Sequence, residues 1–352
     1  MAGDPEPVRI GLVGINDRVC RVIIPGLRAA PHARLVAVCS RSAEKAAATA
    51  AELPGVRPFS DYAAMLREAD IDAVFLCMPP QARYHYVMEA IAAGKHIIAE
   101  KPLSTDINEA RRMVQAARRA GIRTAVNFTY RSVTGFRLVE RLLQQGQVGR
   151  LLHLDFAYFQ TKDLLPGASP KSAVQELGPH ALETILWWGG LAHAGPVEAV
   201  LARHIGVAHA GLPAEAAQCA WQGLLRFRSG AMAAVQLSRI ATGYRNGFRA
   251  TLFGDRGAIA MEVEVDQSRV WAARAGEGRP EGEFRPVPIP EELVLPYDRF
   301  PAFHMERLAA AVAGAAPFPG FAEALRAEEL MDAMIRSDQA GAWVPVAAEA
   351  DA

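Results

Sequence analysis

Hydrophobic and polar positions in the first third of the chain follow a regular alternation. Short, almost purely apolar runs predict buried strands at residues 8–13, 34–39, 73–78, 97–99 and 123–128. Segments with helical spacing lie between them, at residues 19–30, 42–53, 59–69, 81–93 and 106–120. Strands that lack polar alternation are buried on both faces. The pattern therefore predicts an α/β fold with a doubly wound parallel sheet over roughly residues 8–126.

From about residue 127 this alternation stops and a different pattern begins. A helix at 132–145 and a strand at 151–160 precede a loop at 161–172, and strands joined by short turns follow at 197–204, 220–227, 231–239, 248–253 and 258–263. Strands joined in this way are antiparallel, so we expect a C-terminal α+β domain built on a mainly antiparallel, open sheet. A loop at 275–290, helices at 300–313 and 321–340, and a frayed tail at 347–352 complete the expected chain. Two domains are predicted, 1–126 and 127–352.

Composition narrows the possible partners and compartment. The 352 residues carry 38 Lys and Arg against 38 Asp and Glu, which argues against nucleic acid or an acidic membrane as partner. Four cysteines without a CxxC pair indicate buried, reduced thiols and neither a disulfide framework nor a metal site. No apolar run is long enough to span a bilayer, and residues 1–7 lack the apolar core of a signal peptide. We expect a cytoplasmic protein.

The turn after the first strand is a degraded version of a dinucleotide fingerprint. Such a turn has glycine at three positions, which here read Gly14, Asn16 and Val19, with Ile15 between the first two. Asparagine tolerates left-handed backbone better than most residues, but its side chain adds bulk where a phosphate would approach. A tight turn without ligand and a nucleotide site are equally consistent with this motif alone.

The end of the second strand bears on the choice of cofactor. An acid there would bind the ribose 2′-hydroxyl of NAD, whereas an arginine accommodates the 2′-phosphate of NADP. The sequence has Ser40 and Arg41 and no acid, which favours NADP and leaves NAD possible. The alternative is that Arg41 is a solvated residue at the start of the next helix.

The strand at 97–99 ends in Glu100, Lys101 and Pro102. Reactive groups of parallel sheets gather at the carboxyl ends of the strands, so Lys101 is a candidate catalytic group. A surface Glu-Lys pair is the alternative for these three residues taken by themselves.

Combined with more distant motifs, this segment resembles the Gfo/Idh/MocA oxidoreductases, a family that includes glucose–fructose oxidoreductase and inositol dehydrogenase. The motifs are the first βα turn, Met78-Pro79-Pro80 followed by His85, residues 92–96, Glu100-Lys101-Pro102, residues 175–183 and Trp187-Trp188-Gly189. The resemblance implies an N-terminal Rossmann-type domain. It also implies catalytic roles for Lys101, His180 and Glu176. Predicted cofactor contacts are Gly14, Ile15, Asn16, Ser40, Arg41, Met78, Pro79, Pro80, His85, Glu100 and Lys101.

The resemblance implies an NAD(P)-dependent oxidoreductase acting on a hydroxyl or carbonyl carbon of a sugar, cyclitol or similar small molecule. A histidine near neutral pKa can take a hydroxyl proton, and a lysine ammonium can stabilise the resulting negative charge. Glu176 and Glu183 stand where the family more often has Asp, and Tyr130, Arg131, Lys162 and Glu183 are candidate substrate contacts. A homodimer or homotetramer through the C-terminal sheet is expected. A catalytically silent binding protein, or an epimerase or lyase that uses the hydride transiently, remains the alternative.

Overall fold

The computed structural model describes residues 6–164, 172–205, 218–265, 267–276 and 282–346. Part of the predicted loop at 161–172, part of the loop at 275–290 and the tail at 347–352 lie outside the described residues. The chain forms two compact units, of which the first comprises Met1–Ser132 and Pro296–Leu325, and the second Val133–Leu295 and Arg326–Ala352.

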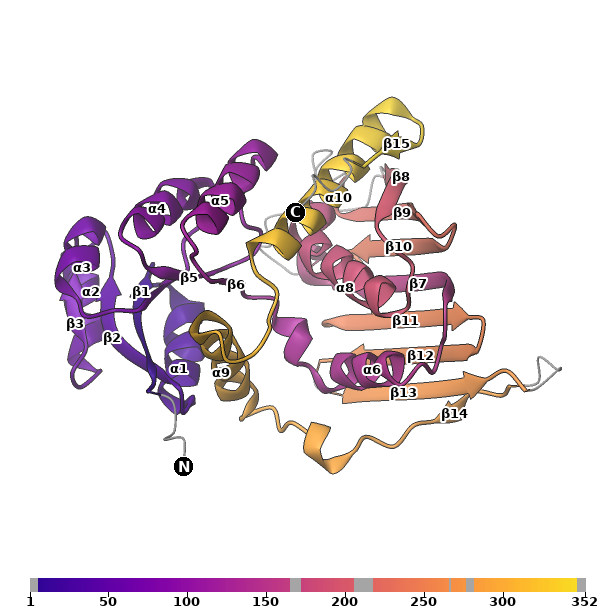
Figure 1. Cartoon of the computed structure of the whole chain (residues 1–352), viewed down its shortest axis with the longest axis horizontal. Coiled ribbons are helices and arrows are strands. Elements are labelled where there is room, and N and C mark those ends of the chain that lie inside the picture. Colours follow the sequence, from indigo (N-terminus) through magenta and orange to yellow (C-terminus); the bar gives the residue numbers. More distant parts are fainter. Residues whose placement is uncertain (1–5, 165–171, 206–217, 266, 277–281, 347–352) are drawn as a thin grey trace. The chain divides into compact units, whose positions relative to one another are not determined.

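The first unit is built on a six-stranded sheet in the order β3-β2-β1-β4-β5-β6, and every neighbouring pair is parallel. This confirms the doubly wound sheet (Figure 1). The strands are β1 (Val8–Val13), β2 (Ala33–Cys39), β3 (Arg57–Phe59), β4 (Ala73–Leu76), β5 (His96–Ala99) and β6 (Thr124–Val126). The helices are α1 (Ile24–Ala29), α2 (Ala43–Ala51), α3 (Tyr62–Glu68), α4 (Pro80–Ala92), α5 (Ile107–Arg119) and α9 (Phe300–Ala313). Because the central strands are buried on both faces, their carboxyl ends form a rigid edge on which ligand-binding loops can be placed.

Each face of this sheet has its own hydrophobic core. On one face, Ile10 and Leu12 of β1 pack with Leu27 of α1 and Leu308 of α9. On the other, residues of α3, α4 and α5 pack against alternate positions of the same strands, together with Phe321 from the segment that follows α9. The return of residues 296–325 therefore completes the first unit.

The helix that follows β1 does not begin as a regular α-helix. Residues Val19–Ile23 form a π-helical turn, which continues directly into α1 with Pro25 at its second position. Proline has no backbone N–H, so one ordinary helical hydrogen bond is lost at this point, and a wider turn satisfies the neighbouring carbonyls.

The second unit is built on a nine-stranded sheet in the order β14-β13-β12-β11-β7-β10-β9-β8-β15. Its strands are β7 (Leu151–Phe159), β8 (Val197–His204), β9 (Ala220–Phe227), β10 (Met232–Ser238), β11 (Gly247–Gly254), β12 (Gly257–Glu264), β13 (Gln267–Arg274), β14 (Arg285–Pro286) and β15 (Val344–Pro345). Its helices are α6 (Thr134–Gln144), α7 (Ala173–Glu176), α8 (Gly178–Leu191) and α10 (Phe321–Ala340, which begins in the first unit).

The sheet is mixed, since β10 pairs with β7 in parallel while the other pairs are antiparallel. The predicted mainly antiparallel sheet is therefore confirmed, with one parallel pair. Turn signals fix only hairpins between consecutive strands, such as β9–β10, and the insertion of β7 between β10 and β11 is a non-local pairing.

Among the described residues, helices lie on one face of this sheet only (Figure 1). Figure 1 shows α6 and α8 lying over one face, on which Leu154, Phe156 and Val235 are buried. On the opposite face, the strand register aligns Leu224, Ala234, Asp155, Thr251, Ala260 and Trp271 in one row across six strands. The predicted open face is thus present, with a mainly small and apolar row along it.

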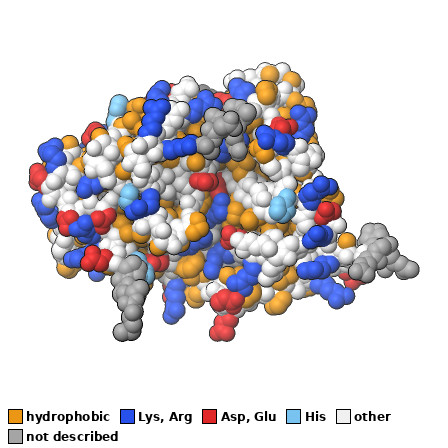
Figure 2. Space-filling model, viewed as in Figure 1, with side chains coloured by type: hydrophobic (Ala, Val, Ile, Leu, Met, Phe, Trp, Pro, Cys, Tyr) orange, Lys and Arg blue, Asp and Glu red, His pale blue; other side chains and the backbone are white. Residues whose placement is uncertain are grey.

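Charged side chains of both signs are interspersed on the face of the molecule shown in Figure 2, in keeping with the balanced composition. Within the described residues, no helix combines the length and the apolar character that crossing a membrane requires. No cluster of His, Cys, Asp and Glu suited to a metal ion occurs in that part of the chain either.

Candidate functional site

The turn after β1 depends on one glycine. Gly14 has φ of 92°, and a Cβ atom there would lie 3.1 Å from the backbone nitrogen of Met78. A side chain at this position would therefore be strained and would also push against the end of β4. Gly14 donates its N–H to the Cys39 carbonyl at 3.0 Å, which ties the turn to the end of β2.

Asn16 does not adopt the left-handed backbone conformation that asparagine tolerates, because its φ is not positive. Its side-chain oxygen accepts the backbone N–H of Val19 at 3.0 Å and so caps the helical segment. Val19, at the third fingerprint position, is buried in the core with 1% exposure. The turn is therefore well formed without the second and third glycines.

A cavity of about 450 Å³ opens at the carboxyl ends of β1, β2 and β4. This size falls in the usual range for small-molecule sites. Seven of the predicted cofactor contacts line it together: Gly14, Ile15, Asn16, Ser40, Arg41, Met78 and Pro79. The other lining residues are Val13, Cys39, Ser42, Lys45, Ser60, Tyr62, Cys77 and Tyr86. Pro80, His85, Glu100 and Lys101 do not line this cavity.

Two cations lie at one end of the cavity. Arg41 and Lys45 flank Ser42, whose hydroxyl oxygen accepts the N–H of Lys45 at 3.2 Å and caps α2. Neither cation has a carboxylate within ion-pair distance among the described residues. Lys45, in the first turn of α2, was not predicted as a site residue, yet it lines the same cavity as Arg41.

Aromatic and sulfur-containing side chains also line the cavity. The Tyr62 hydroxyl donates to the Tyr86 carbonyl at 3.0 Å, and the two rings lie 4.8 Å apart. Burial raises the pKa of Tyr62, and burial aided by Asp61 raises the pKa of Cys39 to about 11. These groups are neutral near pH 7, so they contribute packing surface to the wall. Cys77 and Cys219 are likewise buried, whereas Cys20 is exposed, so the expectation of buried thiols is wrong for Cys20.

The segment that carries Lys101 is held by a buried arginine. Arg83 of α4 has 1% exposure and donates to the carbonyls of Pro102 and of Leu103, the latter at 3.2 Å. Its other terminal nitrogen donates to the Met78 carbonyl at 2.7 Å. Arg83 therefore fixes the loops after β4 and β5 relative to each other. No local sequence signal distinguishes it from the exposed arginines.

Glu100, immediately before Lys101, is 9% exposed and accepts a hydrogen bond from Asn127 at 2.7 Å. Its carboxylate also pairs with Arg18 at 3.1 Å. The interpretation of Glu100 as half of an isolated surface pair is therefore wrong. Lys101 itself is half-buried.

Among the remaining predicted residues of the first unit, Pro80 is the first residue of α4 and His85 is exposed on that helix. Tyr130 and Arg131 lie in a short 3-10 helix, Thr129–Ser132. The positions of these four residues do not show whether they contact cofactor or substrate, so their site roles remain predictions.

The second unit contains the other predicted catalytic residues. Glu176 ends α7, and His180 is the third residue of α8, with 9% exposure and its ring 6.5 Å from that of Tyr158. Glu183, one turn further along α8, is buried. Lys162 opens the 3-10 helix Lys162–Leu164.

A buried ion pair lies beside Glu176 and was not predicted. Arg239 donates to both oxygens of Asp163, at 2.8 and 2.6 Å, and the two side chains are 7% and 1% exposed. A further guanidinium nitrogen of Arg239 lies 4.0 Å from Glu176. Asp163 keeps the pKa of Arg239 raised in spite of burial, so this cation is permanent and attracts the Glu176 carboxylate.

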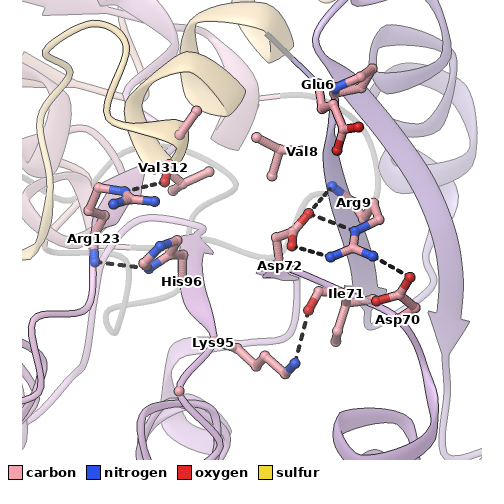
Figure 3. A pocket seen from close by; sticks show the side chains of 13 residues that line it. Glu6, Val8, Arg9, Asp70, Ile71, Asp72, Lys95, His96, Arg123 and Val312 are labelled. Carbon is pink, nitrogen blue, oxygen red and sulfur yellow. Dashed lines mark hydrogen bonds and ion pairs between the residues drawn. The ribbon is translucent and has the colours of Figure 1, made fainter.

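A second cavity, of about 400 Å³, lies at the amino ends of β1, β4, β5 and β6 (Figure 3). Arg9 donates to the two oxygens of Asp72 at 3.0 and 2.6 Å, pairs with Asp70 and holds the pKa of Asp72 below its usual range. Lys95 donates to the Ile71 carbonyl at 2.9 Å. Ligands of doubly wound sheets bind at the carboxyl edge, so we assign these contacts to holding the strand starts together.

Comparison with known proteins identifies both parts of the chain. Residues 8–128 match the family described as "Oxidoreductase family, NAD-binding Rossmann fold", and residues 136–260 match the "GFO/IDH/MocA C-terminal domain". The chain belongs to the Gfo/Idh/MocA oxidoreductase family. The resemblance inferred from the sequence motifs is confirmed.

Individual relatives in this family are distant. The dTDP-3,4-didehydro-2,6-dideoxy-alpha-D-glucose 3-reductase of Streptomyces violaceoruber is 35% identical over 160 residues, which is 45% of this chain and 46% of that protein. Inositol 2-dehydrogenase 2 of Saccharopolyspora erythraea is 27% identical over 282 residues, covering 79% of this chain and 80% of that protein. The chain thus matches just under half of the length of the first of these relatives.

Solved structures of family members share the whole fold. An oxidoreductase domain protein from Kribbella flavida superposes with a TM-score of 0.84 at 26% identity, covering 98% of this chain and 100% of that one. Levoglucosan dehydrogenase in complex with NADH and L-sorbose gives a TM-score of 0.82 at 22% identity, covering 97% and 100%. At this identity the second similarity establishes the fold alone.

Proposed function

We propose that the protein is an NAD(P)-dependent oxidoreductase that transfers a hydride between nicotinamide and a hydroxyl or carbonyl carbon of a sugar, cyclitol or related polar molecule. The observation that carries this proposal is the cavity at the carboxyl edge of the parallel sheet, where seven predicted cofactor contacts meet. Membership of an oxidoreductase family supports it. Relatives named as a deoxysugar reductase and an inositol dehydrogenase support the substrate class.

The residues of the first unit fit a dinucleotide. Gly14 leaves the space that a Cβ atom would fill beside Met78, and the cavity next to it is large enough for the adenosine end. The wall formed by Tyr62 and Tyr86 offers packing surface for an adenine ring. When bound, the nicotinamide would accept or supply the hydride.

NADP is the preferred cofactor in this proposal. Ser40, Arg41 and Lys45 stand at the end of β2, where an acid would be needed to bind the NAD ribose. Two cations without carboxylate partners suit the two negative charges of a 2′-phosphate. We expect Arg41→Ala to weaken NADPH binding by about tenfold, since a hydrogen bond to a charged group contributes ~1.5 kcal/mol or more. NADH binding should change by less than about twofold, because NADH has no 2′-phosphate for a charge-assisted bond.

The chemical roles are proposed from the family resemblance. His180 would take the hydroxyl proton of the substrate, Lys101 would stabilise the negative charge on the same oxygen, and Glu176 would support His180 or bind a substrate hydroxyl. Arg239, 4.0 Å from Glu176, would help to orient its carboxylate. Tyr130, Arg131, Lys162 and Glu183 remain candidate substrate contacts.

Two measurements test this function. Fluorescence titration should show saturable binding of NADPH, and consumption of NADPH with a panel of keto-sugars should reveal turnover. Lys101→Ala should abolish turnover while NADPH still binds saturably, since an interaction needed for chemistry acts mainly on kcat. No binding of either nucleotide at millimolar concentration would remove the oxidoreductase proposal. Bound nucleotide without turnover on any substrate would favour a silent family member instead.

We also propose that the open face of the second sheet joins copies of this chain into a dimer or tetramer. Its apolar row includes Leu224, which is 39% exposed, and Trp271. Leu224→Asp should shift the mass measured by light scattering from oligomer to monomer, whereas a monomeric wild-type protein would contradict this proposal. The absence of disulfides among the four cysteines supports a reducing, cytoplasmic location.

A further inference from the structure

A continuous chain of polar side chains runs through the interior of the first unit. The Asn127 amide nitrogen donates to Glu100 at 2.7 Å, and the Asn127 oxygen lies 2.5 Å from Nε2 of His304. Nδ1 of His304 lies 2.7 Å from the Ser132 hydroxyl. Asn127, His304 and Ser132 are each at most 2% exposed. The chain joins α9 to the carboxyl end of β5.

The direction of these hydrogen bonds follows from the chemistry of the groups. Burial, reinforced by Arg307 and Arg18, lowers the pKa of His304 to about 3, so the ring is neutral and has one N–H. Because the Asn127 amide donates to Glu100, its oxygen must accept, which assigns the proton to Nε2 of His304. Nδ1 then accepts from Ser132. Every hydrogen bond in the chain thus points toward the Glu100 carboxylate and fixes its position.

The second partner of this fixed carboxylate is Arg18. Arg18 stands at the start of the helical segment after the Gly14 turn, and its guanidinium lies 3.1 Å from Glu100 at the end of β5. The strand order is β1-β4-β5, so the Arg18 side chain reaches past the end of β4. It is 51% exposed, and Glu100 is its one ion-pair partner among the described residues. The guanidinium therefore retains N–H groups that can bind a further anion.

The same turn offers fewer backbone donors than a glycine-rich one. A phosphate at a helix N-terminus is bound by free backbone N–H groups. Here the side-chain oxygen of Asn16 accepts the N–H of Val19, one of the donors that a helix N-terminus otherwise leaves free. An anion at this edge consequently needs another source of positive charge.

We propose that Arg18 binds the pyrophosphate of the dinucleotide in place of the missing glycine-rich donors, and that Glu100, Asn127 and His304 are positioning residues that hold Arg18 there. This inference rests on the proposed function. It assigns Glu100 an indirect part in cofactor binding, through Arg18.

The first test measures binding to Arg18→Gln by fluorescence with NADPH and NADH, and by competition with ADP-ribose, which has the pyrophosphate but no nicotinamide. We expect dissociation constants for all three to rise by about 10- to 100-fold, as loss of a charge-assisted hydrogen bond implies. The matched control is Arg21→Gln, which removes the same charge one turn later from a 77% exposed side chain paired with Asp17. An Arg18→Gln variant that binds like Arg21→Gln would overturn the proposal. If the wild-type protein binds none of the three, it is the proposed function that fails.

A double-mutant cycle tests the positioning. Glu100→Gln keeps an acceptor for Asn127 but loses the charge that holds Arg18, so it should weaken NADPH binding by about three- to tenfold. In the Arg18→Gln background the same change should have almost no effect, because there is no guanidinium left to position. His304→Leu, which removes the donor to Asn127, should likewise have almost no effect on NADPH binding in the Arg18→Gln background. Additive effects of Glu100→Gln would mean that Glu100 acts on the cofactor independently, and would refute the positioning role.

Discussion

Acidification tests the neutral state of His304, on which the direction of the buried hydrogen-bond chain depends. The His304 imidazole is 2% exposed and lies between Asn127 and Ser132. Arg307 lies one turn further along the same helix, α9. Protonation would place a charge in this enclosed position beside a cation and would remove the Nδ1 acceptor for Ser132. The folded first unit therefore excludes a proton that the unfolded chain binds readily.

The size of the effect follows from the two pKa values. The unfolded imidazole has its ordinary pKa of 6.5, and the folded one a pKa of about 3. Because the folded pKa is the lower, stability is complete above pH 6.5 and is lost progressively as the pH falls toward 3. At pH 5.0 the linkage corresponds to a loss of ~2 kcal/mol relative to pH 7.5. That is a substantial part of the ~5–15 kcal/mol that typically stabilises a domain.

Urea unfolding at pH 7.5 and 5.0 measures this loss, with His304→Gln as the non-titrating reference. All five tryptophans lie in the second unit, so tryptophan fluorescence follows that unit while circular dichroism follows both. The drop in unfolding free energy of the dichroism transition should be smaller by ~2 kcal/mol in His304→Gln than in wild type. The fluorescence transition should have the same pH dependence in both proteins. If the unfolding free energy from circular dichroism drops equally in wild type and His304→Gln, His304 is not buried in its neutral form.

Two further substitutions test packing and charge. Gly14→Ala should destabilise the first unit by ~1–3 kcal/mol and weaken NADPH binding, as judged by thermal unfolding and titration. Gly55→Ala, with a similar φ of 79° but no atom within 4 Å of the added Cβ, should cost stability without affecting NADPH. Asp163→Asn should destabilise the second unit by ~3–5 kcal/mol in tryptophan-monitored urea unfolding, because it leaves Arg239 buried without its partner. Glu198→Gln, which breaks an exposed ion pair with Arg228, should change the free energy of unfolding by less than ~1 kcal/mol. A similar loss in Asp163→Asn and Glu198→Gln would contradict the greater contribution of the buried pair.

Elements with strong local signals could be predicted from the sequence. β1 and α9 have the predicted bounds, because a mainly apolar run and a regular amphipathic pattern end in clear turns. α5 begins at Ile107, one residue after the expected start, since Asp106 is its N-cap and accepts the N–H of Asn108. These features depend on neighbouring residues only, so periodicity and capping chemistry are sufficient to predict them.

Edge strands could not be predicted in the same way. β3 consists of Arg57, Pro58 and Phe59, of which only Phe59 is buried, and the sequence instead indicated a helix beginning at that residue. Proline is tolerated there because an edge strand leaves one side unpaired. β13, which lies beside the two-residue edge strand β14, likewise has one buried residue, Val270, and no clear alternation. Pairing with an already formed strand, not intrinsic preference, determines both elements.

The cofactor site shows the same division between local and long-range information. The glycine fingerprint is a local pattern, and by that measure only Gly14 remains. The interaction of Arg18 with Glu100 joins residues 82 positions apart, and His304 reaches Glu100 through Asn127 from a segment that returns to the first unit late in the chain. A lost glycine therefore indicates only that the backbone can approach a phosphate less closely. Whether the site still binds an anion depends on the charge that the tertiary structure brings to the strand ends, and here that charge is the Arg18 guanidinium.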